Sequence, residues 1–292
     1  MNRKLCIKGY VYIILSSVIY GCMPLMASHI YSDGVTPMGL VLWRNVLSVP
    51  MLVIIALAFK QPLKIERKRL PSVFSLGIMG CALTPLLLFS SYRYMASGTA
   101  TVLHFVYPLV VVVLEILFLH KGVKWNTVLS LLLFVGGITT FYSPGAEINL
   151  TGSIIALASG VVFAIYIVLL GVFKVGNIPS FTLSIYVAIA SAVSIFAVCL
   201  CTGGISIPKS LFGWGMCLLF ALSVNVFAFV LFQRGTLLIG GSRASIISAL
   251  DPVTSVLVGI VILGEPASWR TVIGAFLIIS ASVLIAVFDR QE

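Results

Sequence analysis

Charged residues are scarce in this sequence. Only 9% of its 292 residues are Asp, Glu, Lys or Arg, whereas 60% are hydrophobic and the mean hydropathy is +1.18. Soluble domains carry about 25% charged residues, so this composition excludes a soluble protein and predicts one whose solvent is mostly lipid. The net charge of +10 does not indicate nucleic-acid binding, because the basic residues lie in short segments beside apolar spans.

The chain also lacks the common motifs of ATP-driven motors and hydrolases. It has no GxxxxGK[ST] phosphate loop, no HExxH pair and no CxxC pair, and five of its six cysteines fall within apolar spans, where they act as small packing residues. A membrane enzyme would need a cluster of polar residues near an interface, and none stands out. We therefore expect no cofactor, no metal and no catalytic residue.

Long apolar runs dominate what is present. Ten of them are long enough to be membrane helices, and the connections leave no room for a soluble domain. The first span directly follows Met-Asn-Arg-Lys and has no clear cleavage site, so we interpret it as a retained helix. The expected spans are 9–31, 36–59, 71–94, 97–119, 125–142, 150–173, 180–202, 210–233, 241–263 and 268–288.

Basic residues are unevenly distributed between the two sides of these spans. If the N-terminus is inside, only Arg93, Lys209 and Arg270 lie outside and Arg44 lies within a span, which leaves fourteen of the 18 Lys and Arg residues on the cytoplasmic side. Lys and Arg are enriched in cytoplasmic loops, so this bias predicts that both termini are cytoplasmic. The protein is then an integral multi-pass protein of the inner or plasma membrane.

The two halves of the chain resemble each other at a fixed offset. Aligning Pro108 with Pro252, 144 positions later, also pairs identical residues at other places without a gap: Ala100 with Ala244, Leu119 with Leu263, Trp125 with Trp269, and Leu133 with Leu277. We divide the chain into repeats at 5–145 and 146–290, each with five spans. Because five is an odd number, the second repeat enters the membrane inverted, which is an architecture of transporters.

Polar residues at membrane depth are the candidates for function. On the fourth span His104, Tyr107 and Glu115 share a helix face, and on the ninth span Ser248 and Asp251 occupy the positions that correspond to His104 and Tyr107. Polar groups at this depth are costly, so two matching stripes suggest the walls of one cavity. The expected substrate-binding residues are Tyr20, Thr84, His104, Tyr107, Phe163, Tyr166, Asn225, Ser248 and Asp251.

Each candidate also has a structural interpretation. Asp251 precedes a proline and could cap freed amides, and Arg44 could anchor its span at the outer interface. Glu115 could pair with Lys121 or Lys124 near the cytoplasmic side. His104 could link transport to protons, because the ordinary pKa of histidine is near neutrality. The small residues of the first and sixth spans, including Gly21 and Gly160, permit close helix contact.

Three runs in the second half resemble a known family. They are LDPVTS from Leu250, LGEP from Leu263 and WRTVIGA from Trp269, and Tyr107, Pro108 and Trp125 repeat part of this pattern in the first half. The chain is similar to the EamA domains of the drug/metabolite transporter superfamily. At His120 and Lys121 it departs from the Gly-Glu that the family often has. The resemblance implies an all-α membrane fold of ten helices in two inverted five-helix repeats, with a central cavity between helices 1, 3, 4, 6, 8 and 9.

These observations together predict a secondary transporter that works by alternating access around a midplane cavity. We expect an exporter of small metabolites, with amino acids or their analogues as substrates, because an aromatic and weakly polar cavity suits a partly apolar organic solute. Two alternatives stay open: a proton-coupled multidrug exporter, and a membrane-embedded binding or sensor protein. The expected partners are the substrate, the lipid bilayer and protons as a candidate coupling ion, in either a monomer or a homodimer.

Overall fold

The fold consists of helices in every part of the chain that is described. The computed structural model describes residues 3–95, 97–120, 122, 124–140, 149–202, 204–263 and 269–288, and these contain no strand. The α-helices are α1 (Arg3–Gly21), α2 (Met23–Ser32), α3 (Pro37–Ala58), α4 (Leu70–Leu76), α5 (Thr84–Ser91), α6 (Ser97–His104), α7 (Tyr107–Leu119), α8 (Trp125–Thr140), α9 (Leu150–Val172), α10 (Ser180–Thr202), α11 (Leu211–Phe220), α12 (Phe229–Ile239), α13 (Gly241–Ile247), α14 (Leu250–Leu263) and α15 (Trp269–Phe288).

Seven helical stretches in the described residues are long and apolar enough to cross a membrane. Helix α8 and the Val272–Leu284 part of α15 are apolar but shorter, and the ninth expected span is divided between α13 and α14. The protein is therefore an all-helical, multi-pass membrane protein, and the number of ten spans stays a prediction. Large apolar side chains cover the exterior, as lipid requires: Leu132 is 61% exposed and Phe276 is 70% exposed.

The third span is interrupted by a π-helical segment, η2 (Gly77–Leu83), which joins α4 to α5. Pro85 has no N–H, so the α-helical bond to the carbonyl of Cys81 is missing. The Thr84 hydroxyl instead donates to the carbonyl of Met79 at 2.7 Å. The freed carbonyl of Cys81 accepts hydrogen bonds from Arg44 and Asn45 of α3, at 3.3 and 3.4 Å. One proline thus creates the polar anchor that fixes α3 against this span.

Prolines also break the fourth and ninth spans. Helix α6 ends at His104 and α7 begins at Tyr107, directly before Pro108. The carbonyl of His104, which Pro108 cannot bond, faces Gly160, where a Cβ atom would lie 2.4 Å from it. In the ninth span, Pro252 frees the carbonyl of Ser248, which accepts from the Asp251 N–H at 3.0 Å.

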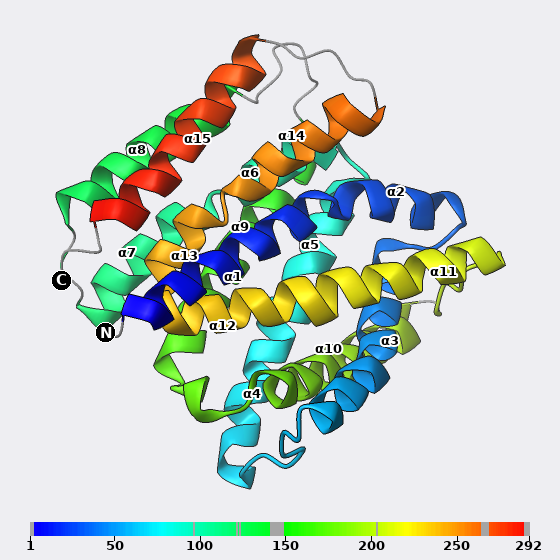
Figure 1. The fold of residues 1–292 in the computed structure, drawn as a ribbon. Helices are drawn as coiled ribbons and strands as arrows, with labels where there is room; N and C mark the ends of the chain where they lie inside the picture. Colours follow the sequence, from blue (N-terminus) through cyan, green and yellow to red (C-terminus); the bar gives the residue numbers. More distant parts are fainter. Residues whose placement is uncertain are drawn as a thin grey trace.

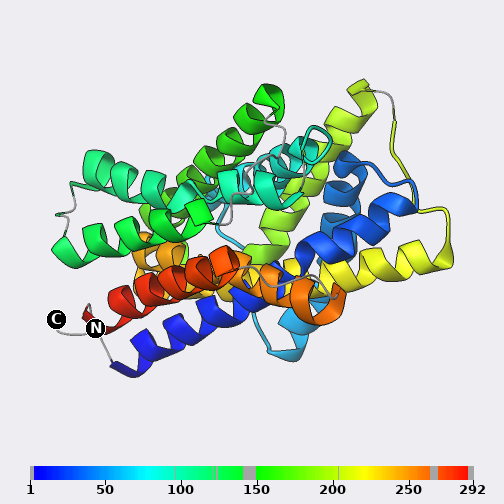
Figure 2. The ribbon, with the colours of Figure 1, turned by 90° about the horizontal axis from the view of Figure 1, so that it is seen from above.

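The helices form a bundle in which partners come from distant parts of the chain (Figures 1 and 2). Helix α3 packs on α10, α1 on α12 and α14, and α9 on α5, α6 and α7, while α8 and α15 pack together at one side of the bundle. The expected close contacts of small residues are present: a Cβ atom on Gly21 would lie 2.5 Å from Cβ of Thr254 on α14. Such contacts bring the broken spans and the first and sixth spans around one centre.

Asp33 connects the ends of two spans. It follows α2, and its Oδ2 accepts hydrogen bonds from the N–H groups of Lys209 (2.8 Å) and Ser210 (3.1 Å), just before α11. Hydrogen bonds from the side chain and backbone of Ser210, together with the Lys209 N–H, hold the pKa of Asp33 below its usual range. The ionised carboxylate therefore stabilises this connection.

Candidate functional site

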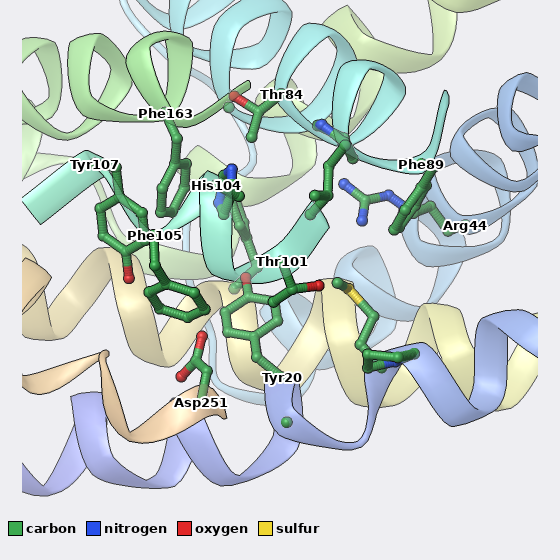
Figure 3. A pocket seen from close by; sticks show the side chains of 17 residues that line it. Tyr20, Arg44, Thr84, Phe89, Thr101, His104, Phe105, Tyr107, Phe163 and Asp251 are labelled. Carbon is green, nitrogen blue, oxygen red and sulfur yellow. The ribbon is translucent and has the colours of Figure 1, made fainter. Parts of the chain in front are cut away.

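A cavity of about 100 Å³ lies at the centre of the bundle, between the first, second, third, fourth, sixth, eighth and ninth spans. Its walls are mostly aromatic and apolar, with a few polar groups that point inward (Figure 3). The lining residues are Tyr20, Gly21, Met23, Pro24, Arg44, Gly80, Thr84, Pro85, Leu88, Phe89, Thr101, His104, Phe105, Tyr107, Phe163, Phe229 and Asp251. An apolar site with a few placed polar groups is typical of pockets for small organic ligands.

Six of the expected substrate-binding residues line this cavity: Tyr20, Thr84, His104, Tyr107, Phe163 and Asp251. The backbone breaks explain how several of them come together. The turn between α6 and α7 turns His104 and Tyr107 toward Phe163, with ring centroids 5.6 and 4.9 Å from it. Asp251 stands in the first turn of α14, directly after the other break. Their role as substrate-binding residues stays a prediction.

His104 is held in one orientation by a hydrogen bond across the bundle. Its Nδ1 lies 2.7 Å from the Ser159 hydroxyl, and that hydroxyl donates to the carbonyl of Ala156 at 2.6 Å. Because a serine has one hydroxyl proton, Nδ1–H must be the donor to Ser159. In the neutral ring, Nε2 is then the hydrogen-bond acceptor that His104 can offer to the cavity.

Arg44 lines the same cavity, although we expected it to anchor α3 at the outer interface. That interpretation is wrong, because the residue is only 5% exposed and its guanidinium lies inside the bundle. One Nη2 hydrogen bond reaches the carbonyl of Cys81, and the guanidinium lies 5.9 Å from the ring centroid of Phe89. Its Nε is buried without a hydrogen-bond partner.

Asp251 supplies a carboxylate to this cavity. Its Oδ1 is buried and has no hydrogen-bond partner, and the neighbouring Ser17 hydroxyl is also buried without one. No ion pair to Asp251 or Arg44 exists among the described residues. A buried charge is stable only when it is paired, hydrogen-bonded or hydrated.

Three expected residues lie behind the cavity wall. The ring of Tyr166 packs against Gly80, where a Cβ atom would lie 2.6 Å from it, and is fully buried. Asn225 donates to the carbonyl of Arg44 and to Oδ1 of Asn45, at 3.2 and 3.0 Å. Ser248 lies 2.5 Å from the Tyr107 hydroxyl. None of the three lines the cavity: partners inside the protein occupy the polar groups of Asn225 and Ser248, and the Tyr166 hydroxyl is buried without a hydrogen-bond partner.

Several lining residues were missed by sequence reasoning, among them Thr101, Phe105 and Phe229. An aromatic residue in an apolar span carries no signal of the face that it occupies, so periodicity alone could not have selected Phe105 or Phe229. Arg44 did carry a signal, a charge within a span, and it was assigned to the wrong environment.

Glu115 belongs to a second cavity. It is 6% exposed and accepts a short hydrogen bond from the Ser242 hydroxyl. The cavity has a volume of about 690 Å³ and lies at the ends of α7, α9, α12 and α13, where Lys174 and Gly240 also line it. Lys121, one of the two expected pairing partners of Glu115, lies outside the described residues. Glu265 of the LGEP run also lies outside them.

The described residues contain no group of three His, Cys, Asp or Glu side chains that could hold a metal ion, and no disulfide joins the six cysteines. The ionisable side chains that line the central cavity include the carboxyl group of Asp251, the guanidinium of Arg44 and the imidazole of His104. This arrangement can bind a small organic solute through ionic contacts and aromatic stacking.

Comparison with known proteins agrees with the fold. The chain is 25% identical over 281 residues to the uncharacterized transporter YcbK of Bacillus subtilis (strain 168), covering 91% of this chain and 88% of that protein. It is 27% identical over 254 residues to the uncharacterized transporter YyaM of the same organism, covering 84% and 82% of the two chains. An uncharacterized transporter of Archaeoglobus fulgidus is 25% identical over 221 residues, covering 74% and 77%.

A crystal structure that is 18% identical superposes with a TM-score of 0.81, covering 97% of this chain and 98% of its own, and this likeness supports the fold alone. The model of the EamA-like transporter family matches residues 7–143 and again residues 150–287. The two matches together span most of the chain. The protein thus belongs to the EamA-like transporter family.

Proposed function

We propose that the protein is a secondary transporter that exports small metabolites such as amino acids by alternating access. The observation that carries this proposal is the central cavity, where Arg44 and Asp251 offer opposite charges inside an aromatic enclosure. Buried charges at membrane depth are costly and are usually functional. In a member of a transporter family, a solute that compensates these charges is the simplest reason to keep them.

An inverted repeat would supply the two states that alternating access needs. The π-helical segments η2 (Gly77–Leu83) and η4 (Ala221–Ala228) begin 144 positions apart, the offset of the repeat. The breaks before α7 and α14 recur at 143 positions. Contacts also correspond: α1 packs on α12 and α14, and α9 packs on α5, α6 and α7. Two similar halves can exchange conformations and open the site to either side.

The separation of the two cavities supports a closed barrier between the central cavity and one end of the helix bundle. The central cavity and the 690 Å³ cavity share no lining residue. Between them lies the hydrogen bond from Tyr107 to Ser248, which joins the two broken spans. Helices α1 and α12 also meet closely on this side, since a Cβ atom on Gly9 would lie 2.4 Å from Ile239. With both termini inside, this barrier would be the cytoplasmic gate.

The orientation can be tested by single-cysteine labelling in a cysteine-free background. We expect Lys64→Cys to react from the cytoplasmic side and Glu147→Cys from the outside, following the bias of Lys and Arg residues. Glu147 lies outside the described residues, so only the labelling can place it. Reaction of position 147 from the cytoplasm alone would contradict both the orientation and the odd number of spans in each half.

Transport itself requires a flux measurement. An untargeted comparison of the growth medium of overexpressing and deleted cells would nominate solutes, and proteoliposomes loaded with each would show whether the purified protein moves it. Thr84→Trp, which places an indole in the cavity, should abolish the flux, whereas Phe276→Ala on the lipid-facing surface should leave it unchanged. Binding without flux in these vesicles would refute the transporter and favour a binding or sensor protein.

A further inference from the structure

We propose that the central cavity selects a zwitterionic solute whose cationic and anionic groups are separated by an apolar or aromatic body. Asp251 would receive the cationic group and Arg44 the anionic group. This inference rests on the proposed transport function, because the same cavity is the transport site.

The first observation is that Arg44 has unused binding capacity. A guanidinium has five N–H donors, and Arg44 makes one hydrogen bond to a protein acceptor, the carbonyl of Cys81, at 3.3 Å. Its Nε is buried and has no partner. The backbone of Arg44 is held by Asn225, whose side chain donates a hydrogen bond to the Arg44 carbonyl. The remaining donors of Arg44 suit a carboxylate or another planar anion.

The second observation is that the carboxyl group of Asp251 also has unused binding capacity. Its Oδ1 is buried without a hydrogen-bond partner, and neutral hydroxyl groups such as that of Ser17 cannot neutralise a carboxylate. An ammonium group supplies both the opposite charge and three donors. A solute that carried only one charge would leave the other protein charge uncompensated, at a cost in binding free energy.

The third observation is the separation of the two groups. Asp251 and Arg44 form no ion pair with each other, and Figure 3 shows them on different sides of the cavity, with Tyr20 and Thr101 between them. A solute with charges at its two ends can place one at each group, whereas a solute whose ammonium and carboxylate share one carbon brings both charges to the same place.

The fourth observation concerns the body between the charges. The lining of the cavity is aromatic: Tyr20 lies between the two groups, and Phe105, Tyr107 and Phe163 lie at the Asp251 end (Figure 3). Aromatic faces stack on flat rings and also attract cations. A ring or short apolar chain between the two charged groups therefore matches the lining, and a polar body such as a sugar does not.

Two isomers test this selectivity directly. 4-(Aminomethyl)benzoate carries its charges at opposite ends of a benzene ring, whereas phenylglycine has the same atoms with both charges on one carbon. We expect the purified full-length protein in proteoliposomes to bind and transport the first at least about 10-fold better, a difference of about 1.4 kcal/mol. Equal or better binding of phenylglycine would overturn the inference and leave the transport function standing.

Singly charged probes assign the two ends. Asp251→Asn should weaken the binding of benzylamine and of 4-(aminomethyl)benzoate by at least about 10-fold and leave benzoate unchanged. Arg44→Gln should weaken benzoate and 4-(aminomethyl)benzoate and leave benzylamine unchanged, and Arg44→Lys should recover part of the loss. Asp33→Asn and Arg93→Gln, the same changes outside the cavity, serve as matched controls.

The outcomes separate the possible failures. A similar loss for all three probes in both variants would mean that the residues are structural, which overturns the inference. If Arg44→Gln does not fold, the Asp251 arm and the comparison of the isomers still decide. Absence of flux for every solute would refute the proposed function itself, whatever the pattern of binding.

Discussion

The hydrogen bond between Tyr107 and Ser248 can be broken from either side, and the two changes should not be equivalent. Both residues are buried, at 1% and 2% exposure, and their hydroxyl oxygens are 2.5 Å apart. Ser248 donates its proton to the carbonyl of Ser245 at 2.9 Å, so Tyr107 is the donor in the shared bond. The bond joins the fourth span to the ninth.

The magnitudes follow from what each variant leaves behind. In Tyr107→Phe the Ser248 hydroxyl keeps its bond to Ser245, so only one hydrogen bond is lost, at about 0.5–1.5 kcal/mol. In Ser248→Ala the Tyr107 hydroxyl stays buried without an acceptor, at about 1–3 kcal/mol. The double variant should cost less than the sum of the two, by a coupling energy of about 0.6 kcal/mol and at most about 1.7 kcal/mol, the mean and the maximum found for hydrogen bonds between membrane helices.

The assay is unfolding of the purified protein by SDS titration in mixed micelles, for the wild type, both single variants and the double variant. A control pair, Tyr107→Phe with Thr182→Ala, should be additive, because Thr182 bonds the carbonyl of Pro62 and shares no partner with Tyr107. Equal costs for the two single changes, together with an additive double variant, would refute the assigned direction and strength of this bond.

Three further changes test the support of the cavity and the loops. Asn225→Ala should cost about 1–3 kcal/mol of stability, because Oδ1 of Asn45 loses its donor, yet solute affinity in vesicles should stay within about 2-fold if Asn225 lies behind the wall. Asp33→Asn should be less stable than the wild type at pH 6. Because the pKa of Asp33 is lowered in the folded state, its stabilising effect is complete above the unfolded value of about 3.9 and is lost as the pH falls below it, so the two unfolding curves should converge in acid. Gly160→Ala should cost about 1–3 kcal/mol and reduce flux, because its Cβ atom would meet a backbone carbonyl at 2.4 Å; an unchanged melting profile would contradict that contact.

Composition and periodicity alone determined much of this protein. With so few charges, the chain has to satisfy its backbone within helices, and the long apolar runs place them. The two spans are broken directly before Pro108 and Pro252, because proline cannot donate to the preceding turn. The polar residues His104, Tyr107 and Asp251 were identified as cavity residues because polar groups in lipid need a partner, and all three line the cavity.

The tertiary structure decided which polar groups remain available. Arg44 reaches the cavity because Pro85, on another span, frees the carbonyl that anchors it, a relation between residues about 40 positions apart. Asn225 and Ser248 carry the same polar signal as Asp251, but neighbouring helices already supply their partners. Helical periodicity tells which residues share a face, whereas only the packing of separate helices determines what covers that face, so the composition of the cavity could not be read from the sequence.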